Sequence, residues 1–366
     1  LFLSNRRILL MATMYATLIT TFIFSFLSRI SSDKKYRILA LFWVVIVSSI
    51  LIVFAGFRTG AIGDTGMYMH SYRLYANNPS TLKLDRDGGF AILNLILIQF
   101  SSDPQTLVFV TSLVVQLLNM IIFYNYRSYL ELQVYIYIAS GYLTTTMNGM
   151  RQCVAAATLF TFTIFIIKGK FKEYVVIVLI VSTIHASALI MIPVYFIVRQ
   201  EAWSRNVVIM VVLACIGVVF YNVLSPILFK ALENTQYGGY SEFNEGGSSF
   251  IRTVVNMVPV FLAYIKRDKL KEEWPESNIF VNMALINVIF VAFGMFNWIF
   301  NRFTLYMQLY NFILIPFIIR NCFKGKERRL LYLGVILCYF VFFYREQVIG
   351  MNMSYPSVLK VEDLFY

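Results

Sequence analysis

The chain has 366 residues, of which 59% are hydrophobic and only 14% are charged, and its mean hydropathy is +0.70. A soluble domain is about 45–50% apolar and about 25% charged, so this composition excludes an ordinary globular protein and places the long apolar runs in lipid. The net charge of +12 would suggest nucleic acid in a soluble protein, but in a membrane protein basic residues first set the topology, so no nucleic-acid partner is expected.

Apolar runs recur from end to end and predict an all-α polytopic membrane protein. Residues 88–101 are too short to cross and are expected to form a re-entrant or surface helix. Residues 174–198 form either one long span or two short ones that turn back near His185. The candidate spans are residues 8–28, 38–56, 105–124, 132–147, 151–167, 206–222, 250–265, 277–300, 303–319 and 330–344.

Short basic connections decide the topology, because lysine and arginine accumulate on the cytoplasmic side. The clearest such connections are residues 28–37, 168–173, 266–273 and 320–329. All four lie on one side only if 88–101 does not cross and 174–198 turns back. The chain is therefore predicted to have about 12 transmembrane helices plus the re-entrant or surface helix, with both termini outside. Residues 8–28 are expected to stay as a helix, since no small-residue cleavage site follows them. Residues 1–366 would form a single integral membrane domain with external loops 57–104 and 223–249.

Basic residues that this topology places outside are mostly arginines. Arg58, Arg151, Arg252 and Arg302 all fall at outer helix ends, and His185 falls at the outer tip of its hairpin. The planar guanidinium matches paired phosphate oxygens, so these four arginines are candidates for binding a lipid-linked pyrophosphate. The alternative is that they extend to lipid headgroups, as arginines at helix ends often do.

Four cysteines without a CxxC pair, and only two histidines, argue against a disulfide framework and against a His/Cys metal centre. We therefore expect no metal and no cofactor.

The chain resembles the EpsG/Wzy-type polymerases of bacterial O-antigen, capsule and exopolysaccharide. The resemblance spans residues 38–320, and its MRQ and IHASAL segments are the most specific. Where the family usually has a glutamate before a glycine and an aromatic residue, this chain has Asp87. The segments that carry the resemblance are RTGAIGDTGMYMHSY (58–72), DGGFAILN (87–94), NGMRQCVAAATLF (148–160), STIHASALIMIPVYF (182–196) and NRFTLYMQLYNFILIP (301–316).

The resemblance implies a GT-C-like helical scaffold in the bacterial cytoplasmic membrane, with its active site toward the periplasm or cell exterior. It implies an inverting, metal-independent transfer between undecaprenyl-pyrophosphate-linked oligosaccharides, which serve as donor and acceptor and release undecaprenyl pyrophosphate. A flippase and a chain-length regulator of the same pathway are possible partners besides the lipid bilayer. An oligosaccharide ligase and a lipid-linked oligosaccharide flippase or transporter remain alternatives.

Three residues compete for the role of general base: His185, Asp64 and Asp87. His185 could accept a proton near neutral pH, or it could hold the hairpin tip. Asp64 could instead cap a following helix, and Asp87 could simply be a solvated loop acid. Three further residues are candidates for sugar binding, although the tyrosines could equally pack against the ends of the spans: Tyr68, Tyr72 and Gln152.

Overall fold

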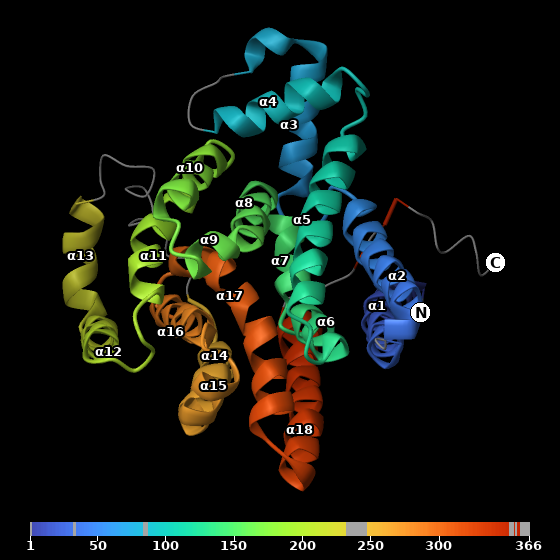
Figure 1. Ribbon diagram of the computed structural model, residues 1–366. Coiled ribbons are helices and arrows are strands. Elements are labelled where there is room, and N and C mark those ends of the chain that lie inside the picture. The colour runs from blue at the N-terminus through green and yellow to red at the C-terminus, as the bar shows by residue number, and fades with distance from the viewer. Residues whose placement is uncertain are drawn as a thin grey trace. The chain divides into compact units, whose positions relative to one another are not determined.

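The structure is a computed structural model that describes residues 2–31, 34–82, 87–231, 247–350, 355, 357 and 358. The described residues are predominantly helical and contain no strand (Figure 1). This confirms the prediction of an all-α protein. Residues 232–246, which make up most of the predicted external loop 223–249, lie outside the described residues.

The chain divides into two compact units. Unit 1 comprises residues 1–163, 172–189 and 323–366, and unit 2 comprises residues 164–171 and 190–322. The expectation of one membrane domain stays a prediction, and each unit is described by itself.

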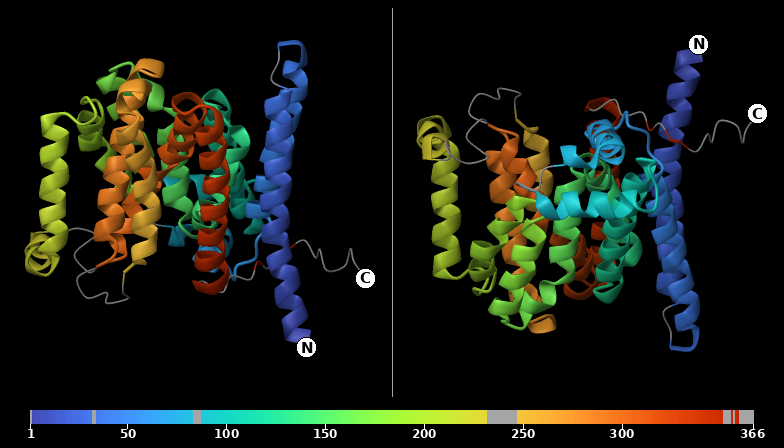
Figure 2. Two further views of the ribbon diagram at one scale, coloured as in Figure 1. Left: turned by 90° about the horizontal axis from the view of Figure 1, so that it is seen from below. Right: turned by 90° about the horizontal axis from the view of Figure 1, so that it is seen from above.

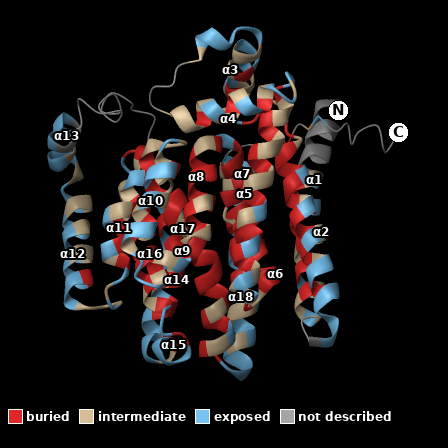
Figure 3. Ribbon diagram, turned by 45° about the horizontal axis from the view of Figure 1, so that its top comes forward, coloured by how far each residue is buried: buried red, intermediate tan, exposed pale blue. Residues whose placement is uncertain are grey.

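Unit 1 is built around α5, which packs on α2 and α8, while α1 packs on α2 and α6. Its α-helices are α1 (Phe2–Ile30), α2 (Arg37–Gly56), α3 (Thr65–Asn77), α4 (Gly88–Ile98), α5 (Gln105–Asn125), α6 (Leu130–Ala139), α7 (Tyr142–Asn148), α8 (Met150–Thr161), α10 (Phe171–Ser182) and α18 (Gly325–Phe343). Its shorter turns are η1 (Lys34–Tyr36), η2 (Pro79–Thr81), η3 (Ala186–Ile190) and the π-helix η6 (Tyr344–Gly350). Figure 3 shows α7 and α8 as largely buried, and every residue of α6 is buried as well.

Small polar residues let α1 approach its neighbours closely (Figure 2). Thr21, Ser25 and Ser28 are fully buried and recur at helical spacing along one face of α1. Thr21 satisfies its hydroxyl within the helix by donating to the carbonyl of Thr17 at 2.7 Å. Ser28 donates instead to the carbonyl of Ala40 in α2, at 3.0 Å. The two helices are thus joined by a hydrogen bond as well as by packing.

A buried carboxylate joins α1, α6 and α18 at the end of unit 1 near the 28–37 connection. Glu131 is fully buried, and its Oε1 lies 2.9 Å from Nε of Arg29 and accepts a hydrogen bond from the Tyr332 hydroxyl at 3.0 Å. Removing Arg29 would leave the Glu131 carboxylate as an unpaired charge in a desolvated position, and removing Tyr332 would cost it a hydrogen bond, so this group helps hold three helices together.

Unit 2 is organised around α16, which packs on α11, α12, α14 and α17. Buried asparagines supply its polar contacts: Asn282 donates to the carbonyl of Gln200 at 2.8 Å, and Asn287 donates to Asn256 at 2.8 Å. The elements are α9 (Thr163–Ile167), α11 (Met191–Val198), α12 (Arg205–Val219), α13 (Tyr221–Ala231), α14 (Phe250–Ile265), α15 (Arg267–Glu273), α16 (Ser277–Phe293), α17 (Ile299–Phe317) and the π-helix η5 (Ile318–Cys322).

Helix lengths support a multi-pass membrane protein but do not support the predicted count of spans. Five helices in the described chain are long and apolar enough to cross a membrane, and a sixth forms if α12 and the start of α13 make one span across their 94° bend. The five begin in α1, α2, α5, α17 and α18, so the predicted spans 8–28, 38–56, 105–124, 303–319 and 330–344 are present as long helices. The remaining predicted spans are shorter or broken.

The predicted spans 132–147 and 151–167 are not continuous helices. The first is divided into α6 and α7 at Gly141, which has a φ of +82° and lies so close to Gln347 that a Cβ would be 2.4 Å from its Nε2. The second is divided into α8 and α9 at Phe162. The first break does coincide with a Ser140–Gly141 pair followed shortly by three threonines, whereas apolar residues and threonine continue across the second without a turn residue.

Two other expectations fit the helices that are seen. Residues 88–98 form α4, whose 11 residues rise about 16 Å and are too few to cross about 30 Å of hydrocarbon. The chain also breaks around His185, since α10 ends at Ser182 and η3 begins at Ala186. Whether the chain turns back at this break stays a prediction, because α10 lies mainly in unit 1 and α11 lies in unit 2.

Candidate functional site

Arg151 is the centre of a polar cluster in unit 1. It is the second residue of α8, and about a third of its side chain is exposed. Its Nε donates to the hydroxyl of Tyr68 in α3 at 3.3 Å, and its Nη1 forms an ion pair with Oδ2 of Asp87. Its guanidinium carbon also lies 5.5 Å from the ring centre of Tyr68 and 5.9 Å from that of Phe90. A cation is therefore held between a carboxylate and two aromatic rings, with part of it open to solvent.

Asp87 is placed by a close approach of α4 to the segment that carries His185. Asp87 immediately precedes α4, and its carbonyl accepts hydrogen bonds from the first turn of that helix. Gly89 is the second residue of α4, and its amide donates to the carbonyl of Thr183 at 2.9 Å. A Cβ on Gly89 would lie 2.2 Å from Oγ1 of Thr183, so only glycine permits this approach.

The His185 segment is fixed from a second side by α8. Gln152, which follows Arg151, is buried and donates through Nε2 to Oγ of Ser187 at 3.1 Å. His185 is half-buried and lies between Thr183 and Ser187, the two points of attachment. The segments DGG (87–89), MRQ (150–152) and IHAS (184–187) thus meet in unit 1. The roles of His185 as base and of Gln152 in sugar binding stay predictions, and Gln152 has a structural contact here.

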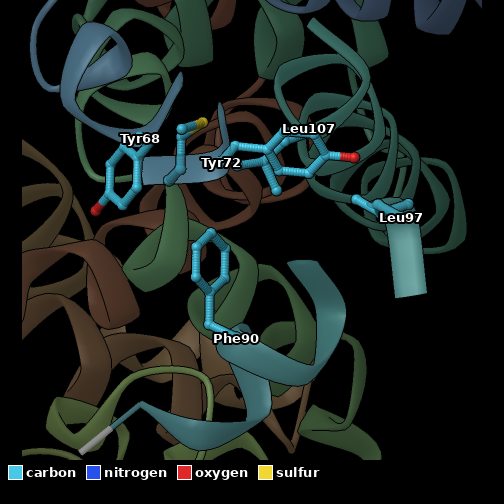
Figure 4. Packing of buried hydrophobic residues seen from close by; sticks show 6 residues of the cluster. Tyr68, Tyr72, Phe90, Leu97 and Leu107 are labelled. Carbon is cyan, nitrogen blue, oxygen red and sulfur yellow. The ribbon is translucent and has the colours of Figure 1, made fainter. Parts of the chain in front are cut away.

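An apolar cluster underlies the polar group (Figure 4). Tyr68 packs against Phe90 with ring centres 5.8 Å apart and the rings at 66°. Tyr72 is fully buried, and its hydroxyl donates to the carbonyl of Ser101 at 2.7 Å. Burial raises the pKa of the Tyr68 phenol, while Arg151 opposes that rise. Both tyrosines therefore pack into the core of unit 1, and their predicted contact with sugar remains untested. The cluster consists of Tyr68, Tyr72, Phe90, Leu97, Leu107 and Met150.

Asp64 and Arg58 both lie at the N-terminal end of α3. Asp64 directly precedes the helix, and Arg58 donates to Thr65, its first residue. Asp64 occupies the N-cap position of α3, as the alternative interpretation expected, although its carboxylate makes no capping hydrogen bond in the structure. Its side chain is partly exposed, and its catalytic role stays a prediction. Arg58 is 1% exposed and hydrogen-bonds to groups of α2, α3 and α5. Its surroundings are those of a buried structural cation, and we leave it out of the proposed pyrophosphate site.

Arg252 and Arg302 lie at one end of unit 2. The carbonyl of Gly294 accepts from the amide of Ser248, just before α14, at 2.8 Å and from Nδ2 of Asn301 at 3.3 Å. This carbonyl therefore joins the start of α14, which carries Arg252, to the start of α17, which carries Arg302. Both arginines are partly exposed, and the Arg302 guanidinium carbon lies 4.4 Å from the ring centre of Trp298. Their contact with pyrophosphate stays a prediction.

The part of the chain that the structure describes contains no group of three His, Cys, Asp or Glu side chains placed to hold a metal ion.

Comparison with protein families decides the identity of the chain. The family model described as the EpsG family matches residues 41–355, which is nearly the whole chain. The chain belongs to the EpsG family. Members of this family are Wzy-like polysaccharide polymerases, which supports a polysaccharide polymerase-type function for this EpsG-family chain. No curated protein and no solved structure matches it.

The residues that assemble the candidate site were only partly predicted from the sequence. Arg151, Asp87 and Tyr68 were predicted, whereas Thr65, Ser112 and Thr183, which hold the surrounding segments, were not. Threonine and serine are common in membrane helices and have no distinguishing pattern. The Gly88–Gly89 pair was a usable signal, because a glycine at the start of a helix often marks a close backbone approach.

Proposed function

We propose that this protein is a glycosyltransferase that polymerises oligosaccharide repeats carried on undecaprenyl pyrophosphate, at the outer face of the bacterial cytoplasmic membrane. The observation that carries the proposal is the partly exposed guanidinium of Arg151, held at the head of α8 by Tyr68 and Asp87. The family supplies the polymerase type, and the site supplies a cation suited to a phosphate group.

The proposed reaction is a single inverting displacement. The acceptor hydroxyl attacks the anomeric carbon at the reducing end of the growing chain, a new C–O bond forms, and the C–O bond to pyrophosphate breaks. Negative charge grows on the leaving pyrophosphate as that bond breaks. A positioned guanidinium therefore stabilises the transition state more than the ground state. Arginine supplies the positive charge that a divalent cation would otherwise supply, and we propose that the transfer needs no metal.

Asp87 is the base that the contacts support best. Its carboxylate is engaged by Arg151 in the structure, and an incoming pyrophosphate carries more negative charge with which to compete for the same guanidinium. Release from Arg151 would leave Asp87 able to accept the proton of the attacking hydroxyl. His185 and Asp64 remain the alternative bases. Arg252 and Arg302 are proposed as further ligands of the pyrophosphate.

The short helices fit a GT-C-like scaffold of about twelve crossings only if some crossings are broken. We propose that α6 and α7, which both lie in unit 1, act together as one broken crossing. Arg151 is the second residue of α8, so a helix end, rather than a helix side, would meet the substrate.

Reconstitution tests the function directly. The purified protein is placed in liposomes with one lipid-linked repeat, in excess EDTA, and the products are separated by size. A ladder of products is expected from a polymerase. One new product formed only with a different acceptor would indicate a ligase, and relocation of the lipid without a new bond would indicate a flippase.

Arg151→Ala is expected to lower the rate of ladder formation by about 100-fold or more, because one preorganised donor to a developing negative charge contributes about that much. Arg151→Lys keeps the charge without the planar fork and should retain intermediate activity. Arg127→Ala is the control, since Arg127 is an exposed arginine of unit 1 whose contacts are local: its guanidinium carbon lies 4.1 Å from the ring centre of Tyr124, and its Nη1 donates to the carbonyl of Tyr124 at 2.8 Å. Equal rates for Arg151→Ala and Arg127→Ala would refute the proposed role of Arg151.

A further inference from the structure

Arg58 lies at the centre of a buried hydrogen-bond network beneath the first turn of α3. Its Nη1 donates to the carbonyl of Ala55 at the end of α2 and to Oγ of Ser112 in α5, the latter at 2.9 Å. Its Nε donates to Oγ1 of Thr65, the first residue of α3, at 2.9 Å. One cation therefore joins three helices of unit 1. Such charge-assisted bonds are strong where water is excluded.

The Arg58 side chain is both protonated and shielded from solvent. Burial lowers its pKa to about 10, so the guanidinium is protonated at neutral pH. A segment near the end of the chain covers it: Ser357 forms a bridge with Arg58, and the amide of Val358 donates to the carbonyl of Phe57 at 2.8 Å. Tyr355 stacks on Phe54 with ring centres 4.1 Å apart. Residues 355, 357 and 358 therefore pack against the end of α2 and the residues that follow it, next to Arg58.

Thr65 extends this network toward Arg151. The same hydroxyl that accepts from Arg58 donates to the carbonyl of Met147 at 3.0 Å. Met147 lies in α7, four residues before Arg151. The neighbouring amide of Asp64 donates to Oδ1 of Asn148 at 2.8 Å. The start of α3 is therefore fixed to the junction between α7 and α8.

Tyr68 connects the two arginines. It lies three residues after Thr65, so both side chains share one face of α3. Thr65 holds Arg58, and Tyr68 accepts a hydrogen bond from Arg151. We propose that Arg58 is a positioning residue, which acts through Thr65 and α3 to hold Tyr68, and hence the guanidinium of Arg151, in place. This inference rests on the proposed function of Arg151 and deepens it.

Direct binding of an anion by Arg58 is the competing explanation, because Nη2 of Arg58 has no hydrogen-bond partner among the described atoms. The two explanations differ in what Thr65 does. If Arg58 acts through α3, loss of the Thr65 hydroxyl disturbs Arg151. If Arg58 binds the substrate itself, the Thr65 hydroxyl matters little.

The test compares Thr65→Val with Thr65→Ser in the reconstituted polymerisation assay. Valine keeps the shape of threonine but removes the hydroxyl, and serine keeps the hydroxyl. Thr65→Val is expected to lower kcat by about 10- to 100-fold with little change in KM, since a misplacement of about 1 Å near a reacting group has effects of this size. Thr65→Ser is expected to stay within about twofold of the parent protein.

A double-mutant cycle distinguishes positioning from a general structural effect. In an Arg151→Lys background, Thr65→Val should cause less than about a twofold further loss, because the group that it positions is already altered. If Thr65→Val does not accumulate as folded protein, Ser112→Ala, which removes only one bond to Arg58, replaces it in the same cycle.

Two results would overturn the inference: full activity of Thr65→Val, or a loss that multiplies with that of Arg151→Lys. If either result is obtained while Arg151→Ala is inactive, only the positioning role of Arg58 is rejected and the proposed role of Arg151 stands. Full activity of Arg151→Ala would reject the proposed function itself.

Discussion

Replacing Gly89 by alanine tests the contact that brings Asp87 to Arg151. A Cβ at position 89 would lie 2.2 Å from Oγ1 and 3.0 Å from the carbonyl carbon of Thr183, whereas ordinary contacts begin at 3.4 Å. Rotation of the Thr183 side chain relieves only the first clash, because the second involves backbone. The start of α4 must therefore move away from Thr183, and the 2.9 Å hydrogen bond between the two residues is weakened or lost.

The expected effect of Gly89→Ala combines two changes that lower stability, one that raises it, and a separate loss of rate. Overpacking of this kind costs about 1–3 kcal/mol, the lost hydrogen bond about 1 kcal/mol, and alanine returns up to about 1 kcal/mol of helix propensity. Asp87 is two residues from the altered position, so a shift of about 1 Å displaces the proposed base from the attacking hydroxyl and lowers the rate by about 100-fold. The net expectation for Gly89→Ala is modest destabilisation with a severe loss of activity.

Gly88→Ala provides the matched control, since nothing lies within 4 Å of a Cβ at that position. It should be as stable as the parent protein or more stable, by up to about 1 kcal/mol, and equally active. The assay measures initial rates of ladder formation in liposomes and thermal unfolding in detergent for both variants. Equal activity of Gly89→Ala and Gly88→Ala would refute the idea that the approach of α4 to Thr183 sets the position of Asp87.

Two further predictions join those made for Arg151 and Thr65. Gly141→Ala should lower the free energy of unfolding by about 1–3 kcal/mol, because alanine is strained at a φ of +82° and its Cβ would meet Gln347. Gly334→Ala, inside α18 and with nothing within 4 Å of its Cβ, should be neutral or stabilising by up to about 1 kcal/mol. Equal thermal stability of the two variants would contradict this prediction. Because the folded-state pKa of Tyr68 is raised above its ordinary value near 10, the folded protein keeps the phenolic proton at a pH where the unfolded chain has lost it. The free energy of unfolding should therefore fall as pH rises above about 10, and Tyr68→Phe should reduce that fall, as measured by thermal unfolding between about pH 8 and 11; an unchanged slope would rule out Tyr68 as its source.

The sequence alone predicted the helical membrane fold class and singled out the DGG, MRQ and IHAS segments, which meet in unit 1. Apolar runs of about 20 residues have no other stable location than lipid, and only helices satisfy their backbone there. The long helices α2, α5 and α18 begin and end close to the expected residues. The break near His185 and the short helix at 88–98 were also readable, because length and charge distribution constrain them.

The number of transmembrane spans could not be predicted correctly from the sequence. Gly141 interrupts α6 and α7 through a left-handed backbone and a contact with Gln347, about two hundred residues away in sequence. A hydropathy profile cannot detect such a contact, because it depends on local composition and not on which distant segment packs nearby.

Tertiary structure decided which of the singled-out residues are assembled and which are buried. Arg58 and Arg151 had the same description in the sequence, as arginines at helix ends. In the fold, Arg58 is enclosed by Ala55, Ser112 and Thr65, while Arg151 keeps part of its surface open beside Asp87. A sequence pattern fixes the side chain and the helix end, but the free energy of a charge depends on the groups packed around it. Those groups come from segments far apart in the chain, and only folding brings them together.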